Sequence, residues 1–186
     1  MIIILVLLIG IGFFMLRGNS DSSGIKTDDV GSFGSVIEKS FVGEWGDIEL
    51  KDIRTGEGFK INDFAGKPIL LETFAVWCPT CLKQQRKIEE LHSEIGDRVV
   101  SISLDTDESE DEAQIKEHIN SNGLDRYFSV SPVDLTKALI EDFGPGVVSA
   151  PSAPVILICE DGSVSKLKSG VKDVEFLREA IGGCST

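Results

Sequence analysis

The stretch ILLETFAVWCPTC, residues 69–81, decides the fold and the chemistry that we predict for this chain. Its apolar first part, residues 69–76, is too short to form a spanning helix and predicts a buried strand. The next stretch, residues 82–95, is polar and rich in residues that favour a helix. Two thiols, Cys78 and Cys81, therefore lie where a buried strand meets a helix, and this context favours a redox-active dithiol.

The start of the predicted helix favours Cys78 as the nucleophile of the pair. If Cys78 caps the helix, Pro79 takes the first helical position, where its missing N–H costs nothing. Unpaired backbone N–H groups and the helix dipole then favour a Cys78 thiolate, which is the species that attacks a disulfide. We expect Cys78 to be the more exposed thiol and Cys81 to resolve the mixed disulfide. A structural disulfide or half of a zinc site are the alternatives.

Three features resemble the thioredoxin-like proteins and, within them, the membrane-tethered TlpA/ResA-type thiol–disulfide oxidoreductases. They are the run FAGKPILLETFAVWCPTC at residues 64–81, the segment APVILI at residues 153–158, and an acidic residue six positions before the first cysteine, Glu72. The first feature is specific, and the resemblance covers about residues 48–182. It implies protein thiol and disulfide substrates, an upstream membrane or soluble electron donor, and no cofactor beyond the redox-active cysteine pair.

The resemblance also assigns roles around the two cysteines. Pro154 matches the family's cis-proline, so the Ala153–Pro154 bond is expected to be cis and to leave backbone groups free for a substrate's extended chain. An ordinary proline that opens a strand is the alternative. The residues between the cysteines, Pro79 and Thr80, tune the redox potential, and a Thr80 hydroxyl bonded to the Cys78 sulfur would stabilise the thiolate.

Glu72 interrupts the apolar run of the predicted strand. A carboxylate is rarely buried without cause, and burial raises its pKa, which suits proton transfer to or from Cys81. The family's buried acid has this role; a glutamate at an exposed edge or paired at a cap is the alternative. We interpret Trp77 as a cover over the sulfurs, with plain core packing as the alternative.

Composition narrows the range of partners. The chain has 186 residues and a formal net charge of -13, from 31 acidic and 18 basic residues. This charge argues against nucleic acid and anionic lipid surfaces as partners. It fits a basic protein partner or simply a solvated acidic surface. The length allows one domain and a tail.

The N-terminal stretch, residues 1–16, is almost wholly apolar and predicts a transmembrane anchor. As a helix it would span about 24 Å, which is short for a bilayer core of about 30 Å. It has no basic region before it and no clear cleavage site after it, so we expect an uncleaved anchor, with a cleaved signal as the second choice. Residues 17–35 read as a flexible linker, and residues 36–186 as the folded domain.

Two sequence arguments disagree about the side of the membrane on which the domain lies. Arg17 and Lys26 follow the apolar segment and no basic residue precedes it, so the positive-inside rule, applied literally, places the domain in the cytosol. The resemblance implies the opposite side. We expect a single-pass cell-membrane protein whose catalytic domain is extracytoplasmic.

The remaining chain alternates strand and helix patterns, which predicts an α/β, thioredoxin-like fold: a central mixed sheet flanked by helices, with an N-terminal β-hairpin extension and an N-terminal membrane helix. The expected elements are a hairpin of residues 48–53 and 59–61, strands at 69–76, 98–104 and 127–130, helices at 82–95 and 112–120, a helix capped by Asp134, a hairpin of 155–159 and 164–168, and a last helix near 174–181.

The other cysteines and the two histidines receive no chemical role. Cys159 is expected to be a small buried hydrophobe and Cys184 a loose terminal thiol, although a second disulfide or a relay stays open. His92 and His118 lie on predicted helices and are expected at the surface. No metal-ligand spacing includes them, so no metal site is predicted.

Two rival functions differ in class from an oxidoreductase of proteins. A non-catalytic thioredoxin-fold binding or metal-delivery module would resemble copper-delivery relatives, which carry Cys-x-x-x-Cys and a later histidine. A thiol peroxidase would place its cysteine in a Thr-x-x-Cys loop near an arginine. This chain has neither pattern. The direction of exchange stays open, although the resemblance favours a reductase of exported proteins.

Overall fold

The structure is a computed structural model, and it describes residues 37–39 and 42–185. The predicted anchor (residues 1–16) and linker (residues 17–35) lie outside the described residues. Within the described part of the chain, no helix is both long enough and apolar enough to cross a membrane.

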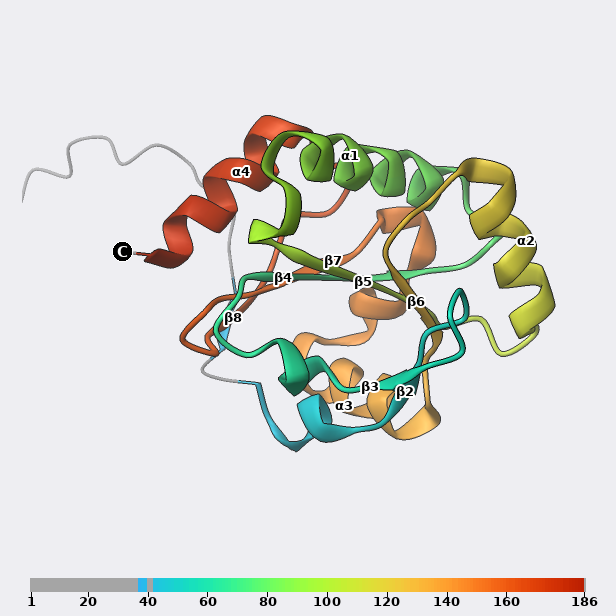
Figure 1. The fold of residues 1–186 in the computed structure, drawn as a ribbon. Helices are drawn as coiled ribbons and strands as arrows, with labels where there is room; N and C mark the ends of the chain where they lie inside the picture. Colours follow the sequence, from blue (N-terminus) through green and yellow to red (C-terminus); the bar gives the residue numbers. More distant parts are fainter. Residues whose placement is uncertain (1–36, 40–41, 186) are drawn as a thin grey trace, which may run out of the picture. The chain divides into compact units, whose positions relative to one another are not determined.

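A six-stranded mixed sheet forms the centre of the domain (Figure 1). Its strands follow the order β1-β8-β7-β4-β5-β6. Strands β4, β5 and β6 run parallel, and β7, β8 and β1 pair antiparallel. The mixed sheet that the sequence predicts is therefore confirmed, with strand bounds β1 Ile37–Lys39, β4 Ile69–Phe74, β5 Val100–Asp105, β6 Tyr127–Val130, β7 Val155–Ile158 and β8 Val164–Lys166.

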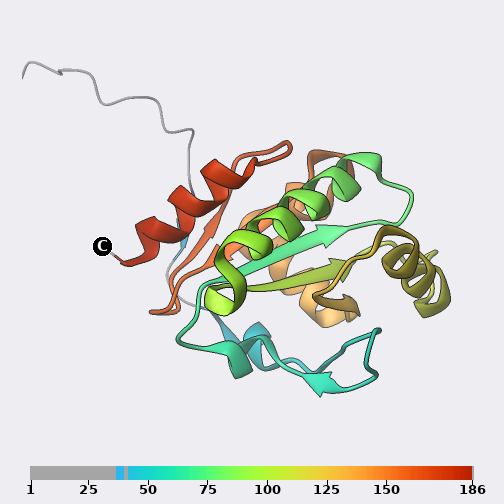
Figure 2. The ribbon, with the colours of Figure 1, turned by 45° about the horizontal axis from the view of Figure 1, so that its top comes forward.

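Helices cover both faces of this sheet (Figures 1 and 2). Helix α1 (Pro79–Ile95) and helix α4 (Val174–Gly182) lie side by side over one face. Helix α3 (Val133–Phe143) packs on the other face, where its Leu135 and Leu139 join the core. Helix α2 (Glu112–Asn122) connects β5 to β6. Only residues 75–78 separate the end of the central strand β4 from the start of α1.

Strand β4 sends alternate side chains to the two faces. Leu71 packs in the cluster on the α3 side, and Leu70 packs with α1 and α4. Glu72 shares the parity of Leu70, so its carboxyl lies under α1, the helix that carries the cysteines. Its neighbours across the sheet are Ser103 on β5 and Val155 on β7.

A separate antiparallel pair lies before the main sheet. Strands β2 (Leu50–Lys51) and β3 (Gly58–Phe59) pair within the stretch expected to form a hairpin. The Phe59 ring packs 4.9 Å from that of Tyr127, between ring centroids, which attaches this pair to strand β6.

One detail of the helix prediction is wrong. Asp134 does not cap α3; Pro132 is the N-cap residue, with no side-chain cap bond. Proline fixes the extended entry into the helix through its ring, and Asp134 lies in the first turn, where its charge still suits the dipole.

Candidate active site

Cys78 occupies the N-cap position of α1, as predicted. Its backbone is extended, with φ -88° and ψ 106°, and Pro79 is the first helical residue. The Cys81 backbone N–H donates a hydrogen bond to the Cys78 sulfur over 3.1 Å. The sulfur therefore accepts one of the otherwise unpaired N–H groups of the first turn.

Both cysteines are free thiols and both are buried, each about 1% exposed. The expectation that Cys78 is the more exposed of the two is wrong, because Phe74, Ala75 and Ala150 belong to the apolar cluster that encloses the pair. The Cys81 thiol donates to the Ala150 carbonyl over 3.0 Å. Burial, reinforced by the hydrogen bond with Cys78, raises the pKa of Cys81 far above its usual range. Cys81 is thus a protonated thiol that needs a proton acceptor before it can attack.

Glu72 is completely buried, as the proton-transfer interpretation requires. Burial raises the pKa of this carboxyl to about 7, against the opposing effects of Arg126, Ser103 and Lys172. The Ser103 hydroxyl donates to Glu72 Oε2 over 2.9 Å. Among the described residues, Glu72 Oε1 has no hydrogen-bond partner. The alternative of a glutamate at an exposed edge is wrong, and the carboxyl can hold or release a proton near neutral pH.

Arg126 is a buried residue of this site that the sequence did not reveal. Its Nη2 lies 3.7 Å from Glu72 Oε2, and its Nε donates to the Ser103 hydroxyl over 3.1 Å. Its Nη1 also reaches the carboxylate of Glu89 on α1, at 2.9 Å. The one available signal was its position directly before the strand beginning at Tyr127, where a basic residue interrupts the approach to the sheet.

Lys172 is the second buried cation that the sequence did not reveal. Its side chain is completely buried, and its ammonium group donates to the carbonyls of Ala153 and Gly170. Burial lowers the pKa of Lys172 to about 8, while Glu72 and Cys81 act in the opposite direction. It lies in a polar loop between β8 and α4, where no pattern distinguishes it from a surface lysine.

The prediction for the Ala153–Pro154 bond is wrong. No peptide bond among the described residues is cis. Ala153 instead turns the chain through the left-handed region, with φ 45°. Its N–H donates to the Ala150 carbonyl over 2.8 Å, and its own carbonyl accepts from Lys172, so its backbone groups are not free for a substrate chain. Pro154 is buried and directly precedes β7, which is the position of a proline that opens a strand.

The residues next to the cysteines differ in exposure. Trp77 is 58% exposed, so plain core packing is wrong for it, and its indole N–H donates to Asp107 over 2.6 Å. Pro79 is exposed and Thr80 is half-buried. The backbone N–H groups of Val76 and Trp77 donate to the Glu110 carboxylate, at 2.7 and 3.3 Å. Acidic side chains of the β5–α2 loop thus hold the segment that leads into Cys78.

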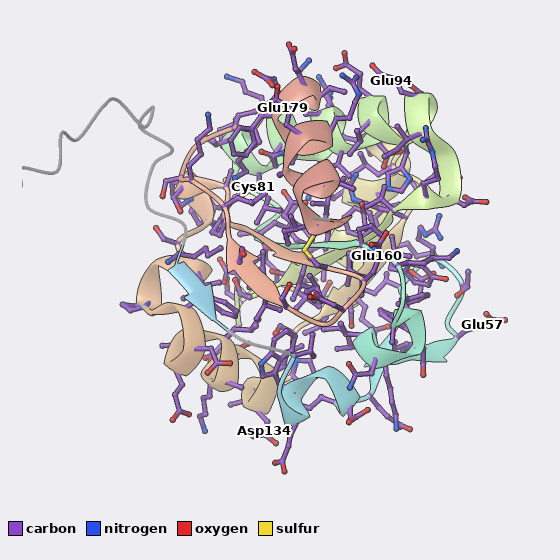
Figure 3. The ribbon with its side chains drawn as sticks, turned by 90° about the vertical axis from the view of Figure 1, so that its left-hand side faces the viewer. Glu57, Cys81, Glu94, Asp134, Glu160 and Glu179 are labelled. Carbon is purple, nitrogen blue, oxygen red and sulfur yellow. A yellow bond between two sulfur atoms is a disulfide. The ribbon has the colours of Figure 1, made fainter. Side chains whose placement is uncertain are left out.

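The other two cysteines form a disulfide, Cys159–Cys184, with a Cα–Cα distance of 5.2 Å (Figure 3). The expectation of a buried hydrophobe and a loose thiol is therefore wrong. The turn after β7 and the short segment after α4 converge at one edge of the domain, although 25 positions separate the two residues in sequence. This bond also excludes a zinc site built from all four thiols.

The histidine predictions are only partly right. His118 is about 7% exposed, and its ring stacks on Phe74 with centroids 5.8 Å apart. It was expected at the surface, but the apolar side of α2 carries it against β4. His92 is half-buried and its Nε2 lies 2.8 Å from the Ser101 hydroxyl. Among the described residues, no group of three or more His, Cys, Asp and Glu side chains could hold a metal ion.

The chain is similar in sequence to proteins named as thiol–disulfide oxidoreductases. The chain is 27% identical over 182 residues to the thiol–disulfide oxidoreductase ResA of Bacillus cereus (strain ATCC 10987 / NRS 248), which covers 97% of this chain and 91% of the relative. It is 29% identical to ResA of Bacillus thuringiensis (strain Al Hakam) over 123 residues, 66% of each chain, so this match spans about two thirds of the relative.

Solved structures of low identity share the fold. A thioredoxin-family thiol:disulfide interchange protein from Chlorobium tepidum TLS has a TM-score of 0.63 at 15% identity, covering 83% of this chain and 100% of that one. BsSco, a member of the Sco family of cytochrome c oxidase assembly proteins, has a TM-score of 0.63 at 17% identity, covering 82% and 97%. At these identities the likeness concerns the fold alone.

The Redoxin family model matches residues 44–181, more than half of the chain. The match includes Cys78, Cys81 and Glu72. With the relatives above, it identifies a thioredoxin-like thiol–disulfide oxidoreductase that belongs to the Redoxin family.

Proposed function

We propose that this protein reduces disulfides in exported proteins from the outer side of a cell membrane, to which residues 1–16 anchor it. The observation that carries the proposal is the pair of free thiols at the start of α1, with a fully buried carboxyl of pKa about 7 under that helix. The ResA relatives support the class of reaction.

The first step uses Cys78. Its thiolate attacks one sulfur of a substrate disulfide, a bond forms between Cys78 and that sulfur, and the other substrate sulfur leaves as a thiolate that takes a proton from solvent. The helix start stabilises the attacking anion, because the Cys81 N–H donates to the Cys78 sulfur.

The second step uses Cys81 and Glu72. The Cys81 thiol gives its proton to the Glu72 carboxylate and attacks the Cys78 sulfur. The bond between Cys78 and the substrate breaks, and the second substrate sulfur leaves as a thiolate. Two electrons have then passed from the dithiol to the substrate, and Cys78 and Cys81 form a disulfide. An upstream membrane or soluble thiol protein restores the dithiol.

The second disulfide supports the placement outside the cytosol. Cys159 and Cys184 are both half-buried, and a bond between partly exposed cysteines persists in oxidising compartments, whereas cytosolic thiols are kept reduced. This argument agrees with the family resemblance and opposes the literal count of basic residues around residues 1–16.

Trapping experiments test the proposed reaction. We expect full-length protein to accelerate insulin reduction by dithiothreitol, Cys81→Ser to accumulate mixed disulfides with partner proteins, and Cys78→Ser to accumulate none. Equal trapping by both variants would overturn the assignment of the nucleophile. Protease access in intact cells, with a cytosolic thiol protein as control, tests the side of the membrane; digestion only after lysis would overturn the outer placement.

The alternative of a non-catalytic binding or metal-delivery module draws on the fold likeness to BsSco. Copper titration of the reduced protein beside insulin turnover separates the two functions. Stoichiometric copper binding without turnover would favour delivery, and turnover without copper binding would favour the reductase.

A further inference from the structure

Lys172 is a completely buried cation that interacts electrostatically with Cys81, and the proposed reaction does not use it. A lysine side chain is rarely buried without a partner, because removing its charge from water is costly. Here the ammonium group has two backbone acceptors, the carbonyls of Ala153 and Gly170. These two carbonyls therefore bind the ammonium group and compensate in part for its burial.

Contacts of the Lys172 backbone fix the residue to the cysteine helix. Gln84 lies three positions after Cys81 and is completely buried. Its side chain accepts from the Lys172 N–H over 2.7 Å and donates to the Lys172 carbonyl over 3.3 Å. The polar loop and the cysteine-bearing face of α1 are thus joined by a reciprocal pair of hydrogen bonds.

Backbone hydrogen bonds of residues 150–153 link the Lys172 ammonium group to the Cys81 thiol. The Ala150 carbonyl accepts both the Cys81 thiol and the Ala153 N–H, at 3.0 and 2.8 Å. The Ala153 carbonyl in turn accepts from Lys172. The Gly170 N–H adds a bond to the Ser152 carbonyl over 2.8 Å. Lys172 therefore holds the segment that positions the Cys81 thiol.

We propose that Lys172 is a positioning residue for the resolving step: it fixes the Ala150–Ala153 segment against Cys81, and its positive charge stabilises the Cys81 thiolate. The inference rests on the proposed function. In the step itself, the Cys81 proton passes to Glu72, the Cys81–Cys78 sulfur bond forms, and the bond from Cys78 to the substrate breaks. Lys172 gives up no proton and no electrons.

The surrounding charges agree with this role. The groups that act on Lys172 are Glu72 from β4, Cys81 from α1 and Lys168 from the same loop. Because burial lowers the Lys172 pKa to about 8, its charge is present at neutral pH and is lost as the pH rises through about 8. The help it gives to Cys81 should fade over the same range.

A two-phase thiol assay separates the steps. Full-length protein, adjusted to two free thiols that peptide mass spectrometry assigns to Cys78 and Cys81, is mixed with one equivalent of Ellman's reagent. The first release of thionitrobenzoate reports attack by Cys78, and the second reports resolution by Cys81. Both rates are measured from pH 5 to pH 10 for wild type, Lys172→Met, Lys172→Gln and Lys172→Arg. The matched control, Lys168→Met, removes an exposed charge of the same loop.

We expect Lys172→Met and Lys172→Gln to slow the second phase about tenfold at pH 7 and to move its pH profile up by about one unit, because an adjacent opposite charge lowers a thiol pKa by about that much. The first phase should change less than about twofold. The Lys172→Gln side chain can still donate to the Ala153 carbonyl, so at high pH its second-phase rate should match that of wild type. The second-phase rate of Lys172→Met should stay lower, because Met has no donor. Arg should restore the profile.

Second-phase profiles of Met and Gln that superimpose on wild type would overturn the inference, as would an equal shift in Lys168→Met. If Lys172→Met does not fold, as judged by its thermal transition, the Gln variant alone decides. A wild-type protein without a second phase would instead refute the proposed function, so the two failures are distinguishable.

Discussion

The two cysteine pairs of this domain lie at different ends of the same central strands and have opposite surroundings. Strand pairing places Glu72 beside Val155 at the end where β4 leads to Cys78, and Ile69 beside Ile158 at the end where β7 leads to Cys159. The first pair consists of two free thiols, and Cys78 is the N-cap residue of α1. The site also contains the buried side chains of Glu72, Arg126 and Lys172. The second pair is a disulfide that joins the turn after β7 to the C-terminal segment.

The comparison shows that chemistry follows from the surroundings of a thiol and not from its presence. Buried Glu72 and Lys172, with pKa values of about 7 and about 8, interact electrostatically with Cys81. Around Cys159 and Cys184 the packed neighbours form an apolar cluster that includes Ile95, Phe176 and Ile181. Substitutions at and around each pair test whether the first pair reacts and the second only stabilises the fold.

Removal of the nucleophile should have the largest effect. We expect Cys78→Ser to lower insulin reduction by at least about 1,000-fold, because the remaining thiol of the site, Cys81, has a strongly raised pKa and is a poor nucleophile. The matched variant, Cys159→Ser with Cys184→Ser, should stay within about threefold of wild type. A comparable loss in the double variant would show that the second pair takes part in turnover.

Replacement of the buried carboxyl should come next. Glu72→Gln should slow release of reduced substrate about 10- to 100-fold, the low end of general acid–base effects, and leave alkylation of Cys78 nearly normal. The measurement is single-turnover reduction of a small disulfide across pH. Wild-type and variant profiles that superimpose would make Glu72 a purely structural residue.

The same variant should change how stability depends on pH. The carboxyl has a pKa of about 7 when folded against an ordinary value of 4.5, so the folded protein holds this proton more tightly than the unfolded chain. Wild type should lose stability relative to Glu72→Gln as the pH rises from 4.5 to 7, by up to about 3 kcal/mol, with no further change above 7. Urea unfolding at pH 4.5, 6, 7 and 8 measures the difference. A difference that is constant with pH would contradict the raised pKa.

Removal of the disulfide should mainly affect stability. Closing a loop across 25 positions is worth about 3 kcal/mol through the unfolded chain, so Cys159→Ser with Cys184→Ser should unfold at lower urea. Dithiothreitol should lower the midpoint of wild type but not of the double variant. An unchanged wild-type midpoint after confirmed reduction would show that the bond adds little to the fold.

Features of this molecule that depend on local sequence could be predicted, whereas features that depend on contacts between distant segments could not. The Cys78 cap, the buried Glu72 and the strands around them follow from residue types within one short stretch. Arg126, Lys172 and the Cys159–Cys184 bond depend on segments that only the folded sheet brings together. The bond before Pro154 is trans, the ordinary state of an X-Pro bond, and the left-handed turn at Ala153, whose carbonyl accepts from Lys172, was not apparent from local sequence.

The smallest effect should come from the exposed ring beside the nucleophile. Trp77 is 58% exposed, and its indole N–H donates to the half-buried Asp107 in a hydrogen bond that is open to solvent. A bond between two solvated groups contributes little, because water replaces either partner. We therefore expect Trp77→Phe to cost less than about 1 kcal/mol in urea unfolding and to change insulin reduction by less than about threefold.

The matched variant for that test is Trp45→Phe, in the core cluster that includes Leu135 and Leu139 of α3. Trp45 is 5% exposed, and its indole N–H donates to Asp142 over 3.0 Å. Loss of this part-buried hydrogen bond to a charged group should cost about 1.5–3 kcal/mol, with turnover unchanged. If Trp77→Phe instead slows the first step of disulfide exchange by tenfold or more, the ring acts on the Cys78 sulfur itself. The interpretation of Trp77 as a cover over the thiols would then gain direct support, and the dithiol end would depend on an exposed residue as well as on its buried charges.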